Sequence, residues 1–207
     1  MAQGGSMATE KDIKEAAGLL KAGGLVVYPT ETVYGLGACA VNRIAVLKVF
    51  VAKKRPLDNP LSVAVRDIGQ ADEIAYVNTA ARKLAKAFMP GPLTVVLKKK
   101  ARLPKELTAG TEKVGIRIPD NAIALRLIEL AGPITATSAN ISGQPSITTA
   151  DEARGQLGGR VDFVLDGGPS RIGVESTVVD VSDDGVLKVL RDGAVARADI
   201  MRVLALR

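Results

Sequence analysis

The sequence predicts a single α/β domain built around a mixed, twisted open sheet with helices on its flanks. Short apolar runs typical of buried strands alternate irregularly with segments whose apolar residues recur at helical spacing. Two β-rich runs, 174–180 and 186–191, flank a turn at 183–185, which indicates a hairpin and therefore a mixed sheet. Because no repeat or composition break marks a second domain, we expect a flexible leader over residues 1–8 and one domain over 9–207.

The N-terminal half alternates helices and strands whose ends are marked by caps, glycines and prolines. Thr9 caps the first helix and Gly23-Gly24 stops it, so that Leu25–Tyr28 is a short buried strand. The segment Pro29–Gly37 is rich in hydroxyls and glycine, and it is either a loop that contacts a ligand or a wide turn with incidental threonines. The elements that follow are a helix over Arg43–Val51, a strand over Leu61–Val65, helices over Ile68–Ala75 and Asn78–Phe88, a break at Met89–Pro92 and a strand over Leu93–Leu97.

The C-terminal half continues the alternation. Lys98–Arg102 holds four cations in five residues, which we expect on a solvated edge or loop. Arg117 stands among apolar neighbours in the strand Val114–Pro119, so it either forms a structural ion pair or faces a cleft. The remaining elements are a helix over Asn121–Leu130, a strand that runs from Pro133 into a hydroxyl-rich segment up to Asn140, a helix over Thr149–Leu157, a strand over Phe163–Leu165, the hairpin, and a closing helix over Ala196–Leu206.

The composition excludes several classes of enzyme. Hydrophobic residues make up 47% of the 207 residues, which is enough for one large core. The chain has no histidine and one cysteine, Cys39, so a histidine-based triad, a zinc hydroxide, an internal disulfide and a cysteine-rich metal centre are excluded. The formal net charge of +6 favours an anionic partner. No apolar run approaches the roughly twenty residues of a membrane span, and no signal-peptide pattern is present, so we expect a cytoplasmic protein without membrane contact.

A basic cluster, Lys53-Lys54-Arg55, ends the second predicted helix. Pro56 and Pro60 turn the chain away from helical geometry, and we expect the three cations to project toward one point. One interpretation is a helix C-terminus carrying cations that the helix dipole favours. The other is a clamp for phosphate, in which arginine makes a two-pronged contact and lysine supplies a point charge.

Further polar residues lie at or beside the predicted strand ends, where open α/β sheets gather ligands. Together they offer cations, hydroxyls and amides, with no carboxylate pair or nucleophile, so they favour a phosphate-bearing substrate held by orientation and charge. Neither of the two common glycine-rich nucleotide loops is present. These residues predict a phosphate-handling pocket and no particular reaction. They are Thr32, Lys53, Arg55, Asn59, Arg117, Ser138, Asn140, Ser176 and Arg191.

Eight motifs carry a resemblance to a known family. They are Tyr28-Pro-Thr-Glu-Thr-Val-Tyr-Gly-Leu-Gly37, Lys53-x-Arg55-Pro56, Asn59-Pro-Leu61, Pro90-Gly-Pro-Leu-Thr94, Gly115-Ile-Arg-Ile-Pro119, Thr137-Ser-Ala-Asn-x-Ser-Gly143, Asp166-Gly-Gly168 and Glu175-Ser-Thr-Val-Val-Asp180. Through them the chain resembles the YrdC-like family of threonylcarbamoyl-AMP synthases over roughly residues 10 to 205. Motifs in this fixed order are far more specific than any one of them.

The resemblance implies an L-threonylcarbamoyladenylate synthase, a nucleotidyltransferase with the YrdC-like fold. Such an enzyme makes threonylcarbamoyl-AMP and pyrophosphate from L-threonine, bicarbonate and ATP, with Mg²⁺ accompanying the ATP. The product serves threonylcarbamoyladenosine modification of tRNA, through a separate transferase of the Kae/TsaD type. The chain looks like the short form of the family, without the C-terminal domain of the longer members.

The family's functional residues carry over position by position. The resemblance assigns L-threonine to Thr32, Arg117, Ser138 and Ser176. It assigns ATP to Lys53, Arg55, Asn59, Asn140, Thr148 and Arg191, and no residue to a metal. Lys53 and Arg55 are the expected catalytic residues, because their charges would offset those of the phosphoryl group and the leaving pyrophosphate.

Three positions depart from the family pattern. Ala64 stands where many members have a histidine near the threonine pocket, and Met89 replaces an aromatic residue. Asp192 stands where a proline is usual in Arg191-x-Gly193.

Three other readings compete with the synthase. A double-stranded RNA or tRNA-binding module without catalysis fits the net charge, although the sequence offers no aromatic stacking platform. A carbamoyl-AMP domain like that of the HypF maturation proteins belongs to long chains with zinc fingers, which one cysteine and no histidine exclude. A purely structural subunit does not explain so many polar residues at strand ends.

Overall fold

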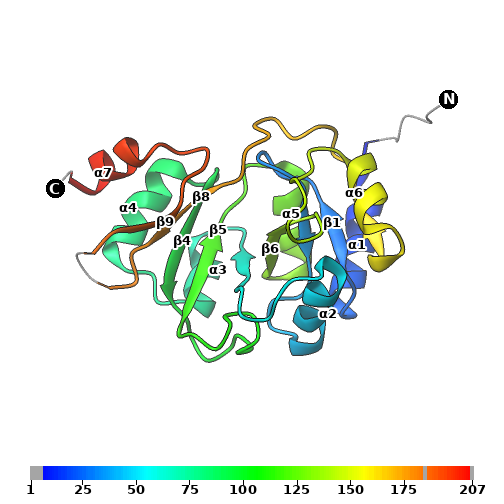
Figure 1. Cartoon of the computed structure of the whole chain (residues 1–207), viewed down its shortest axis with the longest axis horizontal. Coiled ribbons are helices and arrows are strands. Elements are labelled where there is room, and N and C mark those ends of the chain that lie inside the picture. Colours follow the sequence, from blue (N-terminus) through cyan, green and yellow to red (C-terminus); the bar gives the residue numbers. More distant parts are fainter. Residues whose placement is uncertain (1–6, 184–185, 206–207) are drawn as a thin grey trace.

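One continuous sheet runs through the molecule, from β1 beside α1 and α6 at one end to β9 and α7 at the other (Figure 1). The computed structural model describes residues 7–183 and 186–205, and within them nine strands follow the order β7-β1-β2-β6-β3-β5-β4-β8-β9. The strands are β1 (Val26–Tyr28), β2 (Gly35–Gly37), β3 (Ser62–Ala64), β4 (Leu93–Lys98), β5 (Lys113–Arg117), β6 (Ile134–Ser138), β7 (Phe163–Val164), β8 (Thr177–Asp180) and β9 (Lys188–Arg191). The pairs β1–β7, β3–β5 and β4–β8 are parallel and the others antiparallel, so the predicted mixed sheet is confirmed.

Apart from the last helix, the helices begin where the sequence supplies a capping side chain. They are α1 (Glu10–Lys21), α2 (Arg43–Lys53), α3 (Ile68–Ile74), α4 (Thr79–Phe88), α5 (Ala122–Ala131), α6 (Ala150–Leu157) and α7 (Arg197–Ala205), with a short 3₁₀ turn at Gly158–Arg160. The Thr9 and Thr149 hydroxyls each accept from a backbone N–H in a capping box, which satisfies donors that the first turn leaves free. The predicted helix starts at α1 and α6 are therefore confirmed.

The half of the sheet around β1 is covered on both faces. Alternate residues of a strand point to opposite faces. In β1, Val26 packs into the cluster formed by α1 and α5, whereas Val27 packs into the cluster that contains Val49 and Phe50 of α2. Such two-sided burial explains the continuous apolar run at the first strand.

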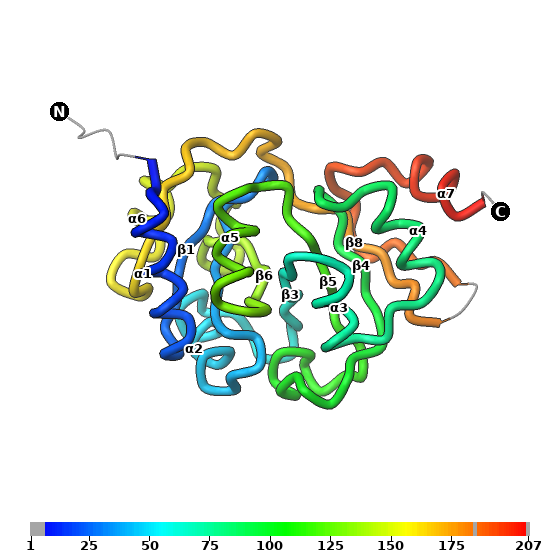
Figure 2. The backbone as a smooth tube through the Cα atoms, turned by 180° about the vertical axis from the view of Figure 1, so that it is seen from behind, coloured from blue at the N-terminus to red at the C-terminus, as the bar shows by residue number. Residues whose placement is uncertain are grey.

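The half of the sheet around β5, β4 and β8 is covered by helices on one face only. In β4, β5 and β8, the side chains of Val95, Ile116 and Val179 enter the core, against which α3, α4 and α7 pack. Figure 2 shows α3 and α4 in front of β4 and β5 in the view from behind. The residues between these positions face the other way, so this half of the sheet presents an open face that can form the floor of a site.

Two sequence-based expectations for the fold need correction. The segment Pro29–Gly37 ends in a strand, β2, which pairs with both β1 and β6. The sequence does not predict this strand, because two of its three residues are glycines. Glycine is required at position 35, since a Cβ there would lie 2.7 Å from the ring of Tyr28 on the opposite strand. The side chains of Lys53, Lys54 and Arg55 do not project toward one point as expected. The left-handed conformation of Lys54 (φ 52°) turns its side chain to solvent.

The hairpin near the C-terminus is confirmed, with Val179 of β8 opposite Val189 of β9. Residues 184 and 185 of its turn, residue 206 of the closing helix and residues 1–6 of the expected leader lie outside the described residues. Within the expected leader, the N–H of Ala8 donates to the carbonyl of Asp166 at 2.7 Å. The boundary between leader and domain at residue 9 stays a prediction.

Candidate active site

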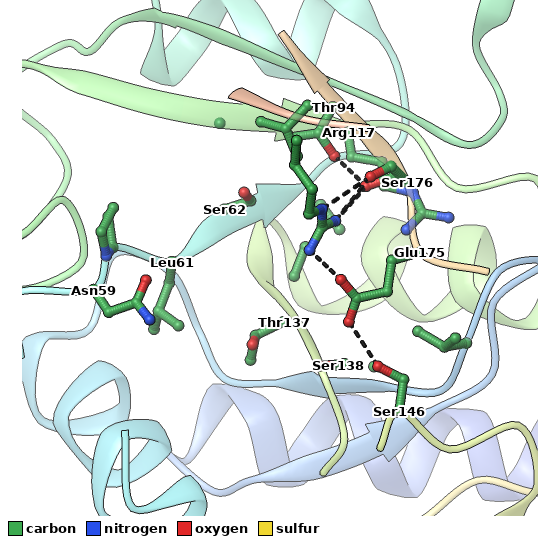
Figure 3. A pocket seen from close by; sticks show the side chains of 18 of the residues that line it. Asn59, Leu61, Ser62, Thr94, Arg117, Thr137, Ser138, Ser146, Glu175 and Ser176 are labelled. Atoms are coloured by element: carbon green, nitrogen blue, oxygen red, sulfur yellow. Dashed lines mark hydrogen bonds and ion pairs between the residues drawn. The ribbon is translucent and has the colours of Figure 1, made fainter. Parts of the chain in front are cut away.

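A cavity of ≈ 680 Å³ lies on the open face of β3, β4, β5 and β8 and extends to β6 and the end of α2. Figure 3 shows polar side chains from separate elements converging on this hollow. The strands supply alternate residues to it, among them Ser62, Thr94 and Arg117. The site therefore covers the face of the sheet as well as the strand ends at which we expected it, because helices cover only the opposite face of these strands.

Eight of the ten predicted site residues line this cavity: Lys53, Arg55, Asn59, Arg117, Ser138, Asn140, Ser176 and Arg191. Thr32 does not line it, but its hydroxyl lies 2.7 Å from Nη2 of Arg117. Thr148 lies at the start of α6, where its N–H donates to Glu152 at 2.7 Å. The structure thus brings together every predicted residue except Thr148, and the assigned roles themselves stay predictions.

Arg117 is both paired and open to the cavity. Its Nη2 donates to Oε1 of Glu31 at 2.8 Å and to the hydroxyl of Thr32 at 2.7 Å. No hydrogen bond joins its Nη1 to any residue that the structure describes. The two interpretations of Arg117 are therefore compatible, since one edge of the guanidinium holds a buried carboxylate while the group still lines the cavity. An outer N–H of such a group can bind a substrate carboxylate.

Lys53 is buried at the end of α2 with 1% of its surface exposed. Its amine donates to the carbonyl of Ser138, to the carbonyl of Asn140 at 2.5 Å and to Oδ1 of Asn140 at 3.4 Å. Burial first, and then the charge of Arg55, lower the pKa of this amine, Glu175 opposes both effects, and the resulting pKa is about 8. Lys53 thus ties the end of α2 to the loop after β6.

Arg55 is held by the turn that follows it. Its Nε donates to the carbonyl of Asn59 at 2.9 Å, and its Nη2 donates to Oδ1 of Asn59 at 2.7 Å and to the carbonyl of Pro60 at 2.9 Å. Burial lowers the pKa of Arg55, Glu175 raises it and Arg191 lowers it. Arg55, Glu175 and Arg191 all line the cavity, which is where these charges act on one another.

A chain of hydrogen bonds joins the opposite walls of the cavity, and Figure 3 follows it from Ser146 through Glu175 toward Ser176. Ser146 donates to Glu175 at 2.6 Å, and Glu175 also accepts from Arg191. Arg191 donates to the carbonyl of Ser176, whose hydroxyl lies 2.8 Å from that of Thr94. The chain fixes Arg191 along the rim of the site.

Sequence reasoning missed several residues of the site. Glu31 and Glu175 received no role, although each precedes a predicted site residue in a motif. A carboxylate is not expected in a pocket for an anion, and only the fold shows that each one pairs with an arginine. Others that line the cavity without having been predicted are Thr30, Ser62, Thr94, Lys113, Gln144, Ser146 and Asp180.

The basic run Lys98–Arg102 begins at the last residue of β4, and its side chains are not unpaired. Each of the four cations has an acidic partner within 4 Å: Asp183 for Lys98, Glu112 for Lys99, Asp72 for Lys100 and Glu73 for Arg102. The local charge that would attract a nucleic acid is therefore partly offset.

Within residues 7–183 and 186–205, no helix is long and apolar enough to cross a membrane. In the same residues, no group of three or more aspartate, glutamate, histidine or cysteine side chains is arranged to hold a metal ion.

Fold and site together define an α/β protein with a large, cation-lined cavity on the open half of a mixed sheet. Residues 18–193 match the model of the Sua5/YciO/YrdC family, which carries the description "Telomere recombination". The chain belongs to this family.

The relatives agree with this placement. The threonylcarbamoyl-AMP synthase of Pyrococcus abyssi is 45% identical over 94% of this chain and 58% of its own length. The putative synthase of Mycobacterium leprae is 40% identical over 94% of this chain and 88% of its own. The chain spans less than three fifths of the Pyrococcus abyssi protein's length.

Solved structures give the same result. The crystal structure of Pyrococcus abyssi Sua5 complexed with L-threonine superposes with a TM-score of 0.92 at 45% identity, covering 95% of this chain and 58% of that one. Escherichia coli YciO superposes with a TM-score of 0.82 at 28% identity, covering 91% and 92% of the two chains.

Proposed function

We propose that this protein is an L-threonylcarbamoyladenylate synthase, which makes threonylcarbamoyl-AMP and pyrophosphate from L-threonine, bicarbonate and ATP. The observation that carries the proposal is a single cavity lined by three arginines, Arg55, Arg117 and Arg191. One cation suits the carboxylate of an amino acid, and the other two suit phosphate oxygens. The Pyrococcus abyssi relative, whose structure is described as a complex with L-threonine, supports the choice of amino acid.

Each substrate would contact the residues that the family pattern assigns to it. Arg117, supported by Thr32, would bind the threonine carboxylate, while Ser138 and Ser176 would bind its amine and side chain. Arg55, Asn59, Asn140 and Arg191 would contact ATP, with Lys53 next to them. Thr148 would need the loop before α6 to move inward, because it lies outside the cavity in this structure.

The reaction joins the two substrates without a protein nucleophile. The threonine amine combines with carbon dioxide to give a carbamate and a proton, or with bicarbonate to give a carbamate and water. A carbamate oxygen then attacks the α-phosphorus in line, the bond to the β-phosphate oxygen breaks, and pyrophosphate leaves with the electron pair. Arg55 and Lys53 would offset the charge that develops on the phosphoryl group and the leaving group.

Mg²⁺ would enter with ATP. This ion prefers to keep several waters and is commonly bound through substrate phosphates rather than by a cage of protein ligands. Both oxygens of Glu175 already accept from Ser146 and Arg191, so the phosphates of ATP and water would hold the ion.

The product would be handed to a separate transferase of the Kae/TsaD type that modifies tRNA, within the cytoplasm. Threonylcarbamoyl-AMP is a mixed anhydride, so its threonylcarbamoyl group can be transferred to an amine with AMP as the leaving group. Contact of this chain with tRNA or double-stranded RNA is the competing function.

The test is pyrophosphate release from ATP and bicarbonate, with and without L-threonine. We expect threonine-dependent release in the wild type and a loss of about a hundredfold or more in Arg55→Ala. Lys54→Ala is the matched control, because it removes the neighbouring positive charge from a side chain outside the cavity. Release that does not depend on threonine at any magnesium concentration would overturn the proposal, and salt-sensitive RNA binding would then be measured.

A further inference from the structure

Glu175 lies where two walls of the cavity meet. Its Oε1 accepts from the hydroxyl of Ser146, at 2.6 Å, in the loop between β6 and α6. Its Oε2 accepts from Nη1 of Arg191, the last residue of β9. One carboxylate therefore connects the loop after β6 to the end of β9, across the rim of the cavity (Figure 3).

The same contact completes the fixation of Arg191. Its Nε and Nη2 donate to the carbonyl of Ser176 at 3.1 and 2.9 Å, and Nη2 also donates to the Ser176 hydroxyl at 3.2 Å. A guanidinium carries five N–H groups. Four of them are used by Glu175 and Ser176, which leaves one N–H of Nη1 without a partner among the described residues.

Glu175 also offsets the repulsion between neighbouring cations. Burial lowers the pKa of Lys53 and of Arg55, and the charge of Glu175 opposes that lowering at both residues, whereas Arg191 lowers the pKa of Arg55. Three cations gathered around one anion would repel one another if the carboxylate were absent. Without the carboxylate, this repulsion would favour conformations in which the partly exposed side chain of Arg191 turns toward solvent.

We propose that Glu175 is a positioning residue, which holds Arg191 and the Ser146 loop in the arrangement that binds the phosphate groups of ATP. The inference rests on the proposed function, since it takes the anion at this end of the cavity to be ATP. It adds a residue that the assigned substrate contacts do not include. The threonine contacts keep other supports without Glu175: Arg117 is held by Glu31 and Thr32, and the Ser176 hydroxyl, although it also accepts from Arg191, lies 2.8 Å from the hydroxyl of Thr94.

The test is calorimetric titration of wild type and variants with MgATP and, separately, with L-threonine. Glu175→Ala is expected to weaken ATP binding about tenfold while threonine binding stays within about twofold of the wild type, because only the ATP end loses a charge-assisted hydrogen bond. Glu175→Gln should recover part of the loss, since its amide oxygen still accepts from Ser146. Ser146→Ala, which leaves all charges in place, should weaken ATP binding by less.

Glu10→Ala is the matched control, since it removes a glutamate paired with Arg126 on the surface, away from the cavity. Three outcomes would overturn the inference: tighter ATP binding in Glu175→Ala, equal weakening of both ligands, or ATP binding within about twofold of the wild type. A different outcome would separate the two proposals. If ATP binding follows the expected pattern across the variants but the wild type releases no threonine-dependent pyrophosphate, the proposed reaction is wrong and the role of Glu175 is still supported.

Discussion

Arg117 and Glu31 form a buried ion pair, in which Nη2 of the arginine lies 2.8 Å from Oε1 of the glutamate. The two residues are 86 positions apart in the chain and are 9% and 3% exposed. Oε2 of Glu31 and Nε of Arg117 are buried without a hydrogen-bond partner in the part of the chain that the structure describes. The pair is therefore held mainly by its own attraction, and the loss of either member leaves a buried charge.

Glu31→Ala should lower the free energy of unfolding by about 3 kcal/mol, because it leaves the Arg117 guanidinium buried without a counter-charge. Glu31→Gln should cost less, since its amide oxygen can still accept from Nη2. Urea denaturation monitored by circular dichroism measures both. In the exposed pair between Glu10 and Arg126, removal of the glutamate should change the free energy of unfolding far less than Glu31→Ala does, because water screens the pair. Equal urea midpoints for Glu31→Ala and wild type would contradict the buried-pair argument.

Gly35 tests the strand that the sequence did not predict. A Cβ there would lie 2.7 Å from Cζ of Tyr28 and 3.0 Å from its hydroxyl. That hydroxyl donates to the carbonyl of Thr135, and the ring is fully buried, so it has little room to shift. Gly35→Ala should therefore destabilise the fold by about 2 kcal/mol, as overpacking does.

The matched control for this glycine is Gly155→Ala, in the middle of α6. No atom lies within 4 Å of a Cβ built at Gly155. Alanine is the better helix former, so this variant should be as stable as the wild type or more stable by up to about 1 kcal/mol. Thermal unfolding of the two variants side by side distinguishes the packing effect at Gly35 from a general effect of replacing glycine.

The starts of helices can be predicted from the sequence, because a capping side chain is next to the helix that it caps. Thr9 and Thr149 lie next to the helices that they start, and the structure places them as expected. The strand β2 is different. Glycine is disfavoured in strands, so the local sequence 35–37 does not indicate one. These residues nevertheless pair with β1, where the ring of Tyr28 leaves room only for glycine opposite it. A contact across strands of this kind is not visible in a local pattern.

The site shows the same division. Residues whose chemistry suits a substrate, such as Arg55 and Ser176, can be found from type and motif. Residues that serve those groups, such as Glu31 and Glu175, have the opposite charge to what an anion site predicts, and only the fold reveals their partners. The direction of Lys54 depends on one left-handed backbone angle, for which a lysine gives no signal in the sequence.

Lys53 should make stability depend on pH in the alkaline range. Burial lowers its pKa from the usual 10.5 to about 8, so between these two values the unfolded chain binds more protons than the folded one. Stability gained from this residue therefore increases as pH rises from about 8 to 10.5, and below pH 8 the full cost of burying the charged amine is present.

The comparison that isolates this effect is wild type against Lys53→Met. The difference in free energy of unfolding between the two should shift in favour of the wild type by about 1 to 3 kcal/mol across the window, since one pKa unit corresponds to about 1.4 kcal/mol. The bonds from the amine to the carbonyls of Ser138 and Asn140 favour the charged form and set the lower end of this range. A difference that stays constant from pH 8 to 10.5 would show that Lys53 keeps an ordinary pKa.

Gly193 controls the position of Arg191 through the backbone. A Cβ at Gly193 would lie 2.4 Å from the carbonyl oxygen of Glu175 and 2.6 Å from the amide nitrogen of Thr177, and neither backbone atom can rotate away. The N–H of Ala194 also donates to that carbonyl at 3.1 Å, so the segment after β9 lies directly against the segment before β8. Gly193→Ala should push the two segments apart and move the Arg191 guanidinium away from Ser176.

We therefore expect Gly193→Ala to weaken ATP binding by about tenfold, because Arg191 loses its alignment, and to lower the free energy of unfolding by about 1 to 3 kcal/mol. Gly159→Ala is the control, since a Cβ there meets no atom within 4 Å. Equilibrium dialysis with labelled ATP, together with urea denaturation, measures both quantities. If the variant is destabilised but binds ATP as the wild type does, the two segments can separate without moving Arg191, and this arginine is then fixed mainly by its bonds to Glu175 and Ser176.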